Sequence, residues 1–130
     1  MKYLRTYESL NSEEEFLKDI KDILLEVEDM GYITRIIEST WPKDSKEYVI
    51  WINIINKSLC GNYIRPIDFN EIKDCVLRIK DYLGNKFVGC LTQTSDNSMD
   101  GVWRNIDLGE DTTLDYEFRC LEISYNPYKI

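Results

Sequence analysis

The fold is decided by the stretch IKDILLEVED at residues 20–29, which returns as IKDCVLRIKD at residues 72–81. Five of the ten positions are identical between the two copies. In both copies, apolar residues recur every three or four positions, which is the spacing of a helix with one apolar face. The repetition predicts an internal duplication. The alternative is that two amphipathic helices resemble each other through their shared periodicity alone.

Each predicted helix has recognisable start and stop signals. Ser12–Glu15 matches the S-x-x-E capping box, and Gly31 can adopt the left-handed conformation that often ends a helix. Asp68, followed by Glu71, is a second cap pattern, and Gly84 is a second stop signal. The first helix is therefore expected to begin at Ser12 and to end before Gly31, and the second to lie between Asp68 and Gly84.

Runs of β-branched and aromatic residues follow each predicted helix in pairs. The first pair is Tyr32–Trp41 and Glu47–Ile55, and the second pair is Phe87–Thr94 and Tyr116–Tyr125. In the last run, the alternation of apolar and polar residues slips near Cys120–Leu121, where we expect a β-bulge. The sequence thus predicts four strands, two after each helix.

Together these elements predict a single α+β domain over residues 1–130. Two duplicated αββ units, at about 12–56 and about 68–125, are expected to form a four-stranded antiparallel sheet. Both helices should lie on one face of that sheet, because two apolar helix stripes need a common surface to cover. The segment 95–114, between the last two strands, is expected to be a long loop.

The composition excludes several classes of function. The 130 residues carry 16 basic and 24 acidic side chains, and the net charge of −8 repels nucleic-acid backbones and anionic membranes but favours a basic or neutral partner. No histidine is present, which excludes Ser-His and Cys-His catalysis and imidazole metal sites. No phosphate-binding glycine motif and no nucleophile elbow occurs either. We therefore expect a protein that is not an enzyme.

The N-terminal residues carry no export signal, since residues 1–10 mix charged and aromatic side chains and lack an apolar core. No apolar run is long enough to span a bilayer. We expect a cytoplasmic protein, in which thiols stay reduced. The cysteines are then interpreted as small core residues: Cys60, Cys75, Cys90 and Cys120.

The second predicted strand is apolar on both of its faces. If the helices cover the side that carries Tyr48, Ile50, Ile52 and Ile54, alternation leaves Val49, Trp51, Asn53 and Ile55 on the other side. An uncovered aromatic face marks an interaction site. It could be covered by the 95–114 segment, by a second copy of the chain or by a partner protein. The predicted binding surface consists of Val49, Trp51, Asn53, Trp103 and Arg104.

Residues 96–107 have the oxygen spacing of an EF-hand calcium loop. Oxygen-bearing side chains fall at loop positions 1, 3, 5 and 12, and Gly101 stands at position 6, where the loop turns sharply. The match is imperfect, because Ser98 stands at loop position 3, where a carboxylate or an amide is usual, and because no helices are expected on either side of the loop. A plain polar loop is the alternative. The candidate metal ligands are Asp96, Ser98, Asp100 and Asp107.

The opening residues MKYLRTYES, at positions 1–9, resemble the start of many small uncharacterised accessory proteins of tailed bacteriophages. The resemblance implies a viral protein in the cytoplasm of the host cell that binds and inhibits a host protein, such as a component of a defence system. It implies no catalytic residue. Two other functions stay open. One is a sponge that holds a nucleotide signal between aromatic residues at a homodimer interface, and the other is a calcium-binding structural protein of the virion.

Overall fold

A computed structural model describes residues 2–42, 47–56, 65–94 and 102–128, with side chains described from Phe16 onward. The chain begins with a long helix and continues with strands and a second helix. In chain order the elements are α1 (Lys2–Asp29), β1 (Tyr32–Glu38), β2 (Ile50–Asn56), α2 (Phe69–Leu83), the short 3-10 helix η1 (Gly84–Lys86), β3 (Phe87–Gln93), β4 (Trp103–Asn105) and β5 (Cys120–Tyr125).

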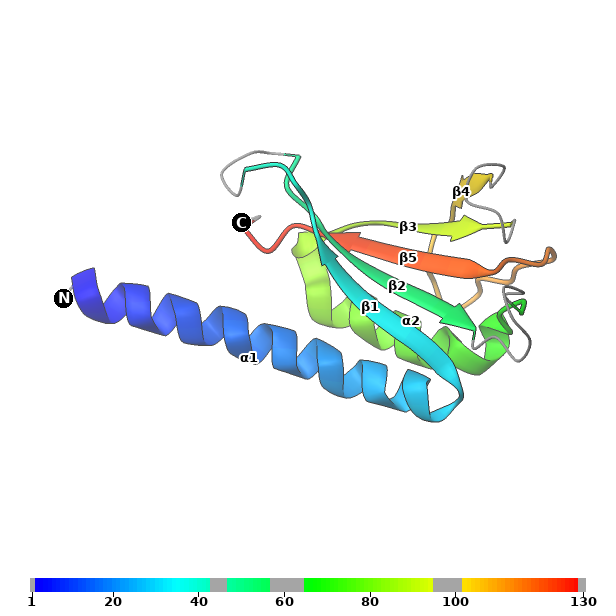
Figure 1. The fold of residues 1–130 in the computed structure, drawn as a ribbon, viewed down its shortest axis with the longest axis horizontal. Helices are drawn as coiled ribbons and strands as arrows, with labels where there is room; N and C mark the ends of the chain where they lie inside the picture. The colour runs from blue at the N-terminus through cyan, green and yellow to red at the C-terminus, as the bar shows by residue number, and fades with distance from the viewer. Residues whose placement is uncertain (1, 43–46, 57–64, 95–101, 129–130) are drawn as a thin grey trace.

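The strands form one antiparallel sheet in the order β1-β2-β5-β3-β4. Both helices lie on the same side of this sheet (Figure 1). The predicted α+β class is therefore confirmed, and so is the placement of both helices on one face. The other side of the sheet carries no helix among the described residues.

The prediction of four strands is wrong, because the sheet has a fifth strand, β4. This short strand comes from the segment 95–114, which was expected to be a loop, and it pairs with the end of β3. The two halves of the chain do repeat the order helix, strand, strand, and β2 and β5 lie side by side. The duplication of two αββ units stays a prediction, since β4 has no counterpart in the described part of the first half.

Several predicted boundaries move. Helix α1 begins at Lys2, ten residues before the capping box at Ser12, because no Gly or Pro interrupts residues 2–15. Strand β1 ends three residues earlier than predicted, β2 begins three residues later, and β5 begins four residues later. The register shift lies in β3, between Phe87 and Gly89, and not near residue 120, where β5 pairs regularly.

The caps of α2 lie at Asp68 and Gly84, as predicted, but the Asp68 N–H donates to the Tyr32 hydroxyl and not to Glu71. The Asp68 side chain accepts a hydrogen bond from the Asn70 N–H at 3.1 Å, and the Gly84 N–H donates to the carbonyl of Lys80. At the end of α1, Gly31 has a φ of 102° and its N–H donates to the Glu28 carbonyl at 2.9 Å. These glycines adopt a backbone conformation that other residues rarely reach.

The core lies between the sheet and the two helices. Each helix turns one apolar stripe toward the same side of the sheet, which explains why the echoed segments share their apolar positions. Cys75 and Cys90 belong to this core, as predicted for small apolar residues, whereas Cys60 lies outside the described residues. The central buried side chains are Ile20, Leu24, Val27, Ile52, Ile54, Ile72, Val76, Ile79, Leu121 and Ile123.

Gly84→Ala is expected to lower the free energy of unfolding by roughly 1–3 kcal/mol, because the φ of 56° and ψ of −127° strain any residue that has a Cβ atom. Gly89→Ala is the matched control. A Cβ there would meet only Ser124 Oγ, at 3.9 Å. Urea unfolding of both variants measures the difference, and an equal loss in both would contradict the argument from backbone conformation.

Candidate functional site

The sheet side away from the helices is called the open face. Strand alternation and register assign its side chains. They are Ile33, Arg35 and Ile37 of β1, Trp51, Asn53 and Ile55 of β2, Cys120, Glu122 and Ser124 of β5, Leu91 and Gln93 of β3, and Trp103 and Asn105 of β4.

The open face exposes several large apolar side chains. Ile33, Ile37 and Trp103 are 36%, 41% and 43% exposed. Trp51 and Ile55 of β2 lie beside Ile37 and Ile33 in register and are half-buried, whereas Trp103 lies on β4 at the opposite edge of the sheet. Isolated exposed apolar residues are common, but a contiguous group on one surface is typical of an interaction site.

A polar row crosses the middle of the open face. Arg35, Asn53 and Glu122 are direct neighbours in register on β1, β2 and β5. Burial raises the pKa of the half-buried Glu122 carboxyl. Within the described residues, neither Glu122 nor Arg35 forms an ion pair, and the buried Oδ1 atom of Asn53 has no hydrogen-bond partner. The row therefore contains polar groups without complementary partners.

The predicted binding-surface residues do not all lie together. Trp51, Asn53 and Trp103 share the open face, and Val49 lies one residue before β2, half-buried, with its carbonyl accepting from the Ser39 N–H at 3.0 Å. Arg104 lies on the opposite face, because the register pairs it with the buried Thr92.

Arg104 has a different environment from the one predicted for it. Its guanidinium carbon lies 4.7 Å from the centre of the Tyr116 ring, a cation–π geometry. Arg104 therefore does not share the open face with the tryptophans, and its part in a binding surface stays a prediction.

Of the four candidate calcium ligands, only Asp107 lies within the described residues. It is exposed, and its backbone carbonyl accepts a hydrogen bond from Thr112 Oγ1 at 2.7 Å. Asp96, Ser98 and Asp100 lie outside the described residues. Among the residues that the structure describes, no group of three His, Cys, Asp or Glu side chains could hold a metal ion. Calcium binding stays a prediction.

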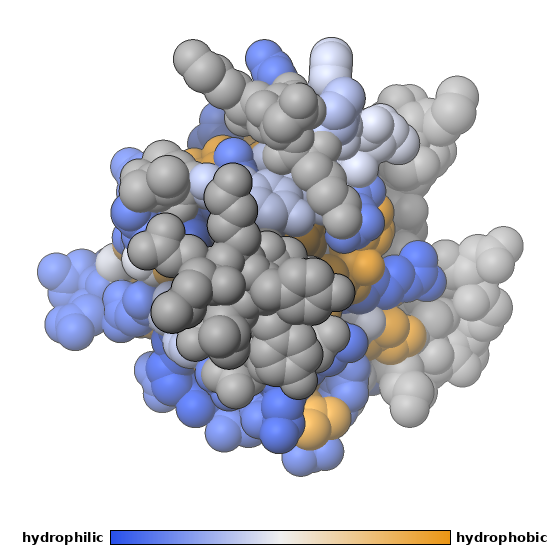
Figure 2. All heavy atoms as spheres, turned by 90° about the vertical axis from the view of Figure 1, so that its left-hand side faces the viewer, coloured by the Kyte–Doolittle hydropathy of each residue, from blue (hydrophilic) through white to orange (hydrophobic). Residues whose placement is uncertain are grey.

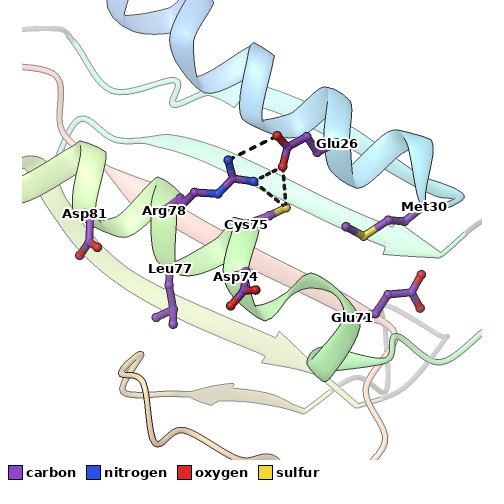
Figure 3. Close-up of a pocket in the computed structure, with 8 residues that line it drawn as sticks. All are labelled: Glu26, Met30, Glu71, Asp74, Cys75, Leu77, Arg78 and Asp81. Carbon is purple, nitrogen blue, oxygen red and sulfur yellow. Dashed lines mark hydrogen bonds and ion pairs between the residues drawn. The ribbon is translucent and has the colours of Figure 1, made fainter.

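A second surface, which was not among the predicted sites, lies between the two helices. We call it the helix groove, a hollow of about 460 Å³. Figure 3 shows Glu26 reaching from α1 toward α2, where Arg78 and Cys75 meet it. The residues that line the groove are Glu26, Met30, Glu71, Asp74, Cys75, Leu77, Arg78 and Asp81.

Arg78 and Glu26 form an ion pair across the helix groove. The hydrogen bond from Arg78 lowers the pKa of the Glu26 carboxyl. Cys75 Sγ lies 3.3 Å from Arg78 Nη2 and 3.6 Å from Glu26 Oε2, and burial raises the pKa of its thiol. Burial therefore disfavours the thiolate, which is the nucleophilic form of cysteine.

The sequence did contain a signal for this contact. Glu26 and Arg78 are both the seventh residue of the repeated ten-residue stretch, and they carry opposite charges. Opposite charges at equivalent positions of two neighbouring helices could have indicated that the two positions meet.

The remaining charges of the helix groove are acidic. Four carboxylates and one guanidinium line it, a net charge of −3. Glu71 accepts a hydrogen bond from the Tyr32 hydroxyl at 3.2 Å, and Asp74 and Asp81 are exposed. The α2 lysines do not balance them, because Lys73 and Lys80 donate to backbone carbonyls of the segment at 108–110.

Seen from the left end of Figure 1, the described surface is mostly hydrophilic and is interrupted by small hydrophobic patches (Figure 2). No helix in the described ranges combines the length and the apolar character needed to cross a membrane.

A scan of protein-family models found no match, and searches of curated proteins and of solved structures found none either.

Proposed function

We propose that this chain is a non-enzymatic binding protein that binds a basic segment of a host protein through the helix groove. The observation that carries the proposal is the groove's net charge of −3, beside apolar side chains. The resemblance of residues 1–9 to phage accessory proteins supports a host protein as the target. Binding in a fixed ratio would then inhibit that protein without any chemical step.

The charge of the groove favours lysine and arginine side chains. Asp74 and Asp81 lie on the same face of α2, seven residues or about two helical turns apart, so basic groups with the same spacing in a partner could meet both. The net charge of −8 over the whole chain adds long-range attraction, which raises the rate of encounter with a basic protein.

The apolar side chains of the groove indicate what else the partner should carry. Met30 of α1 is 41% exposed, and Leu77 of α2, which also lines the groove, is half-buried. Methionine adapts to differently shaped apolar surfaces. A segment with apolar residues between its basic ones, as on one face of an amphipathic helix, therefore fits the groove better than a purely basic tail.

A charge-reversal pair tests the proposal. Asp74→Lys/Asp81→Lys is expected to weaken binding of a labelled amphipathic Lys/Leu helical peptide by about tenfold or more, because like charges would then meet in the groove. Fluorescence anisotropy measures the dissociation constant. The control is Asp115→Lys/Glu117→Lys, which makes the same change in net charge at exposed residues outside the groove.

The control variant should bind the peptide within about threefold of the parent protein, a difference below 1 kcal/mol. Equal weakening by both variants would show that only net charge matters, and it would contradict a site in the groove. The same two variants, used to capture proteins from a bacterial lysate, should differ in the same way for a genuine host target.

A further inference from the structure

From the polar row of the open face, we infer that two copies of this chain pack sheet against sheet, so that Arg35 of each copy pairs with Glu122 of the partner subunit. This inference concerns a surface other than the helix groove and does not depend on the proposed function.

The positions in the row match a two-fold axis. Arg35, Asn53 and Glu122 lie on adjacent strands, and adjacent strands are about 4.8 Å apart, so Arg35 and Glu122 flank Asn53 at equal distances. An axis that runs along β2, above Asn53, exchanges the two sides of the row. It therefore places each Arg35 opposite the partner's Glu122, and the pairing occurs twice, as a symmetric interface requires.

The rows on either side of the polar row are also self-complementary. Ile37, Trp51 and Ser124 form one row, so the same axis brings Trp51 opposite its own counterpart and Ile37 opposite the partner's Ser124.

Ile33, Ile55 and Cys120 form the other row, in which Ile55 meets its counterpart and Ile33 meets the partner's Cys120. The two charged positions thus lie between rows that are mostly apolar.

The unpaired groups of the row point to the same arrangement. Glu122 is a half-buried carboxylate without a described cationic partner, and Arg35 on the same face has none either. Packing of two copies gives each of these charges its opposite. Asn53 lies on the axis between these two charges, and its buried Oδ1 atom has no hydrogen-bond partner within the described part of the chain.

Reciprocal charge reversal tests this packing. Arg35→Glu places two carboxylates opposite each other, and Glu122→Arg places two guanidinium groups opposite each other. Each single variant should raise the dissociation constant of the dimer about tenfold or more, measured by sedimentation equilibrium over a range of protein concentrations.

Two combinations should restore the dimer. An equal mixture of the two single variants should form a heterodimer, because the first copy then offers two carboxylates to the two guanidinium groups of the second. The double variant Arg35→Glu/Glu122→Arg should form a homodimer, because both pairs are re-formed with exchanged charges. Since misfolded chains could not restore each other, recovery in the mixture also shows that both single variants fold.

The control is Lys21→Glu, a charge reversal of an exposed residue of α1, far from the open face, which should leave the dimer unchanged. Three results would overturn the inference. The first is a parent protein that stays monomeric at all concentrations, as expected where another part of the chain covers the open face. The second is a dimer that neither single variant weakens. The third is that the mixture and the double variant both fail to re-associate.

Discussion

Ile123→Ala is expected to lower the free energy of unfolding by about 2–5 kcal/mol. Ile123 lies in the central strand β5, is 0% exposed, and is flanked in register by Ile52 of β2 and Cys90 of β3. Removal of its side chain leaves a cavity that the two neighbouring strands and the helices above cannot close. Since a domain of this size has a total stability of about 5–15 kcal/mol, the loss is a large fraction of the whole.

Denaturant unfolding at a fixed protein concentration measures this loss, read from the midpoint at an unchanged slope. Val88→Ala is the matched control. Val88 lies at the register shift of β3 and is 53% exposed, so its truncation should change the stability by only about 0.5 kcal/mol. Similar losses in the two variants would contradict the assignment of Ile123 to the core.

Cys90 is expected to resist alkylation in the folded protein by roughly a thousandfold at pH 8. Burial raises the pKa of its thiol to about 12 from the ordinary value of 9.0, and only the thiolate reacts. Cys120, whose pKa burial raises to about 11, should be protected roughly a hundredfold on the same argument. Both thiols should react at the rate of a free cysteine once the chain is unfolded.

Pulsed labelling with iodoacetamide, followed by mass spectrometry of the digested protein, reports each cysteine separately. This separation is necessary because Cys60 lies outside the described residues. A Cys90 thiol that reacts in the native protein as fast as in urea would contradict the burial of that strand. Cys120 reacting more slowly than Cys90 would contradict their order of pKa values.

The helices were predictable because their signals are local. Capping by Asp68 and termination at Gly31 and Gly84 depend on residues within a few positions of each helix end. The start of α1 could not be predicted in this way, because a capping-box pattern can also occur inside a helix when no residue before it ends the helix. The S-x-x-E pattern at Ser12 is such a case.

Strand β4 could not be predicted, because three residues are too few to show an alternation. Trp103–Asn105 is a strand only because the edge of β3 is available to it, which is a tertiary condition. The same limit explains the error at Arg104. Without the register, no pattern tells which side of the sheet a residue of so short a strand faces.

The candidate surfaces also differ in how far the sequence predicts them. The open face of β2 followed from the period of two in a strand, which places Trp51 and Asn53 on one side without any knowledge of the neighbours. The row from Arg35 to Glu122 required the strand order, because these residues lie 87 positions apart in the chain. The helix groove required the distance between two helices, which no local pattern contains.

The ion pair between Glu26 and Arg78 has a consequence for any ancestor built from one half of this chain. In an assembly of two identical halves, the side chain at this position would meet its own copy, and two glutamates or two arginines would repel each other. Opposite charges at the two equivalent positions are compatible only with halves that differ. At this position the two helices are therefore complementary and not interchangeable.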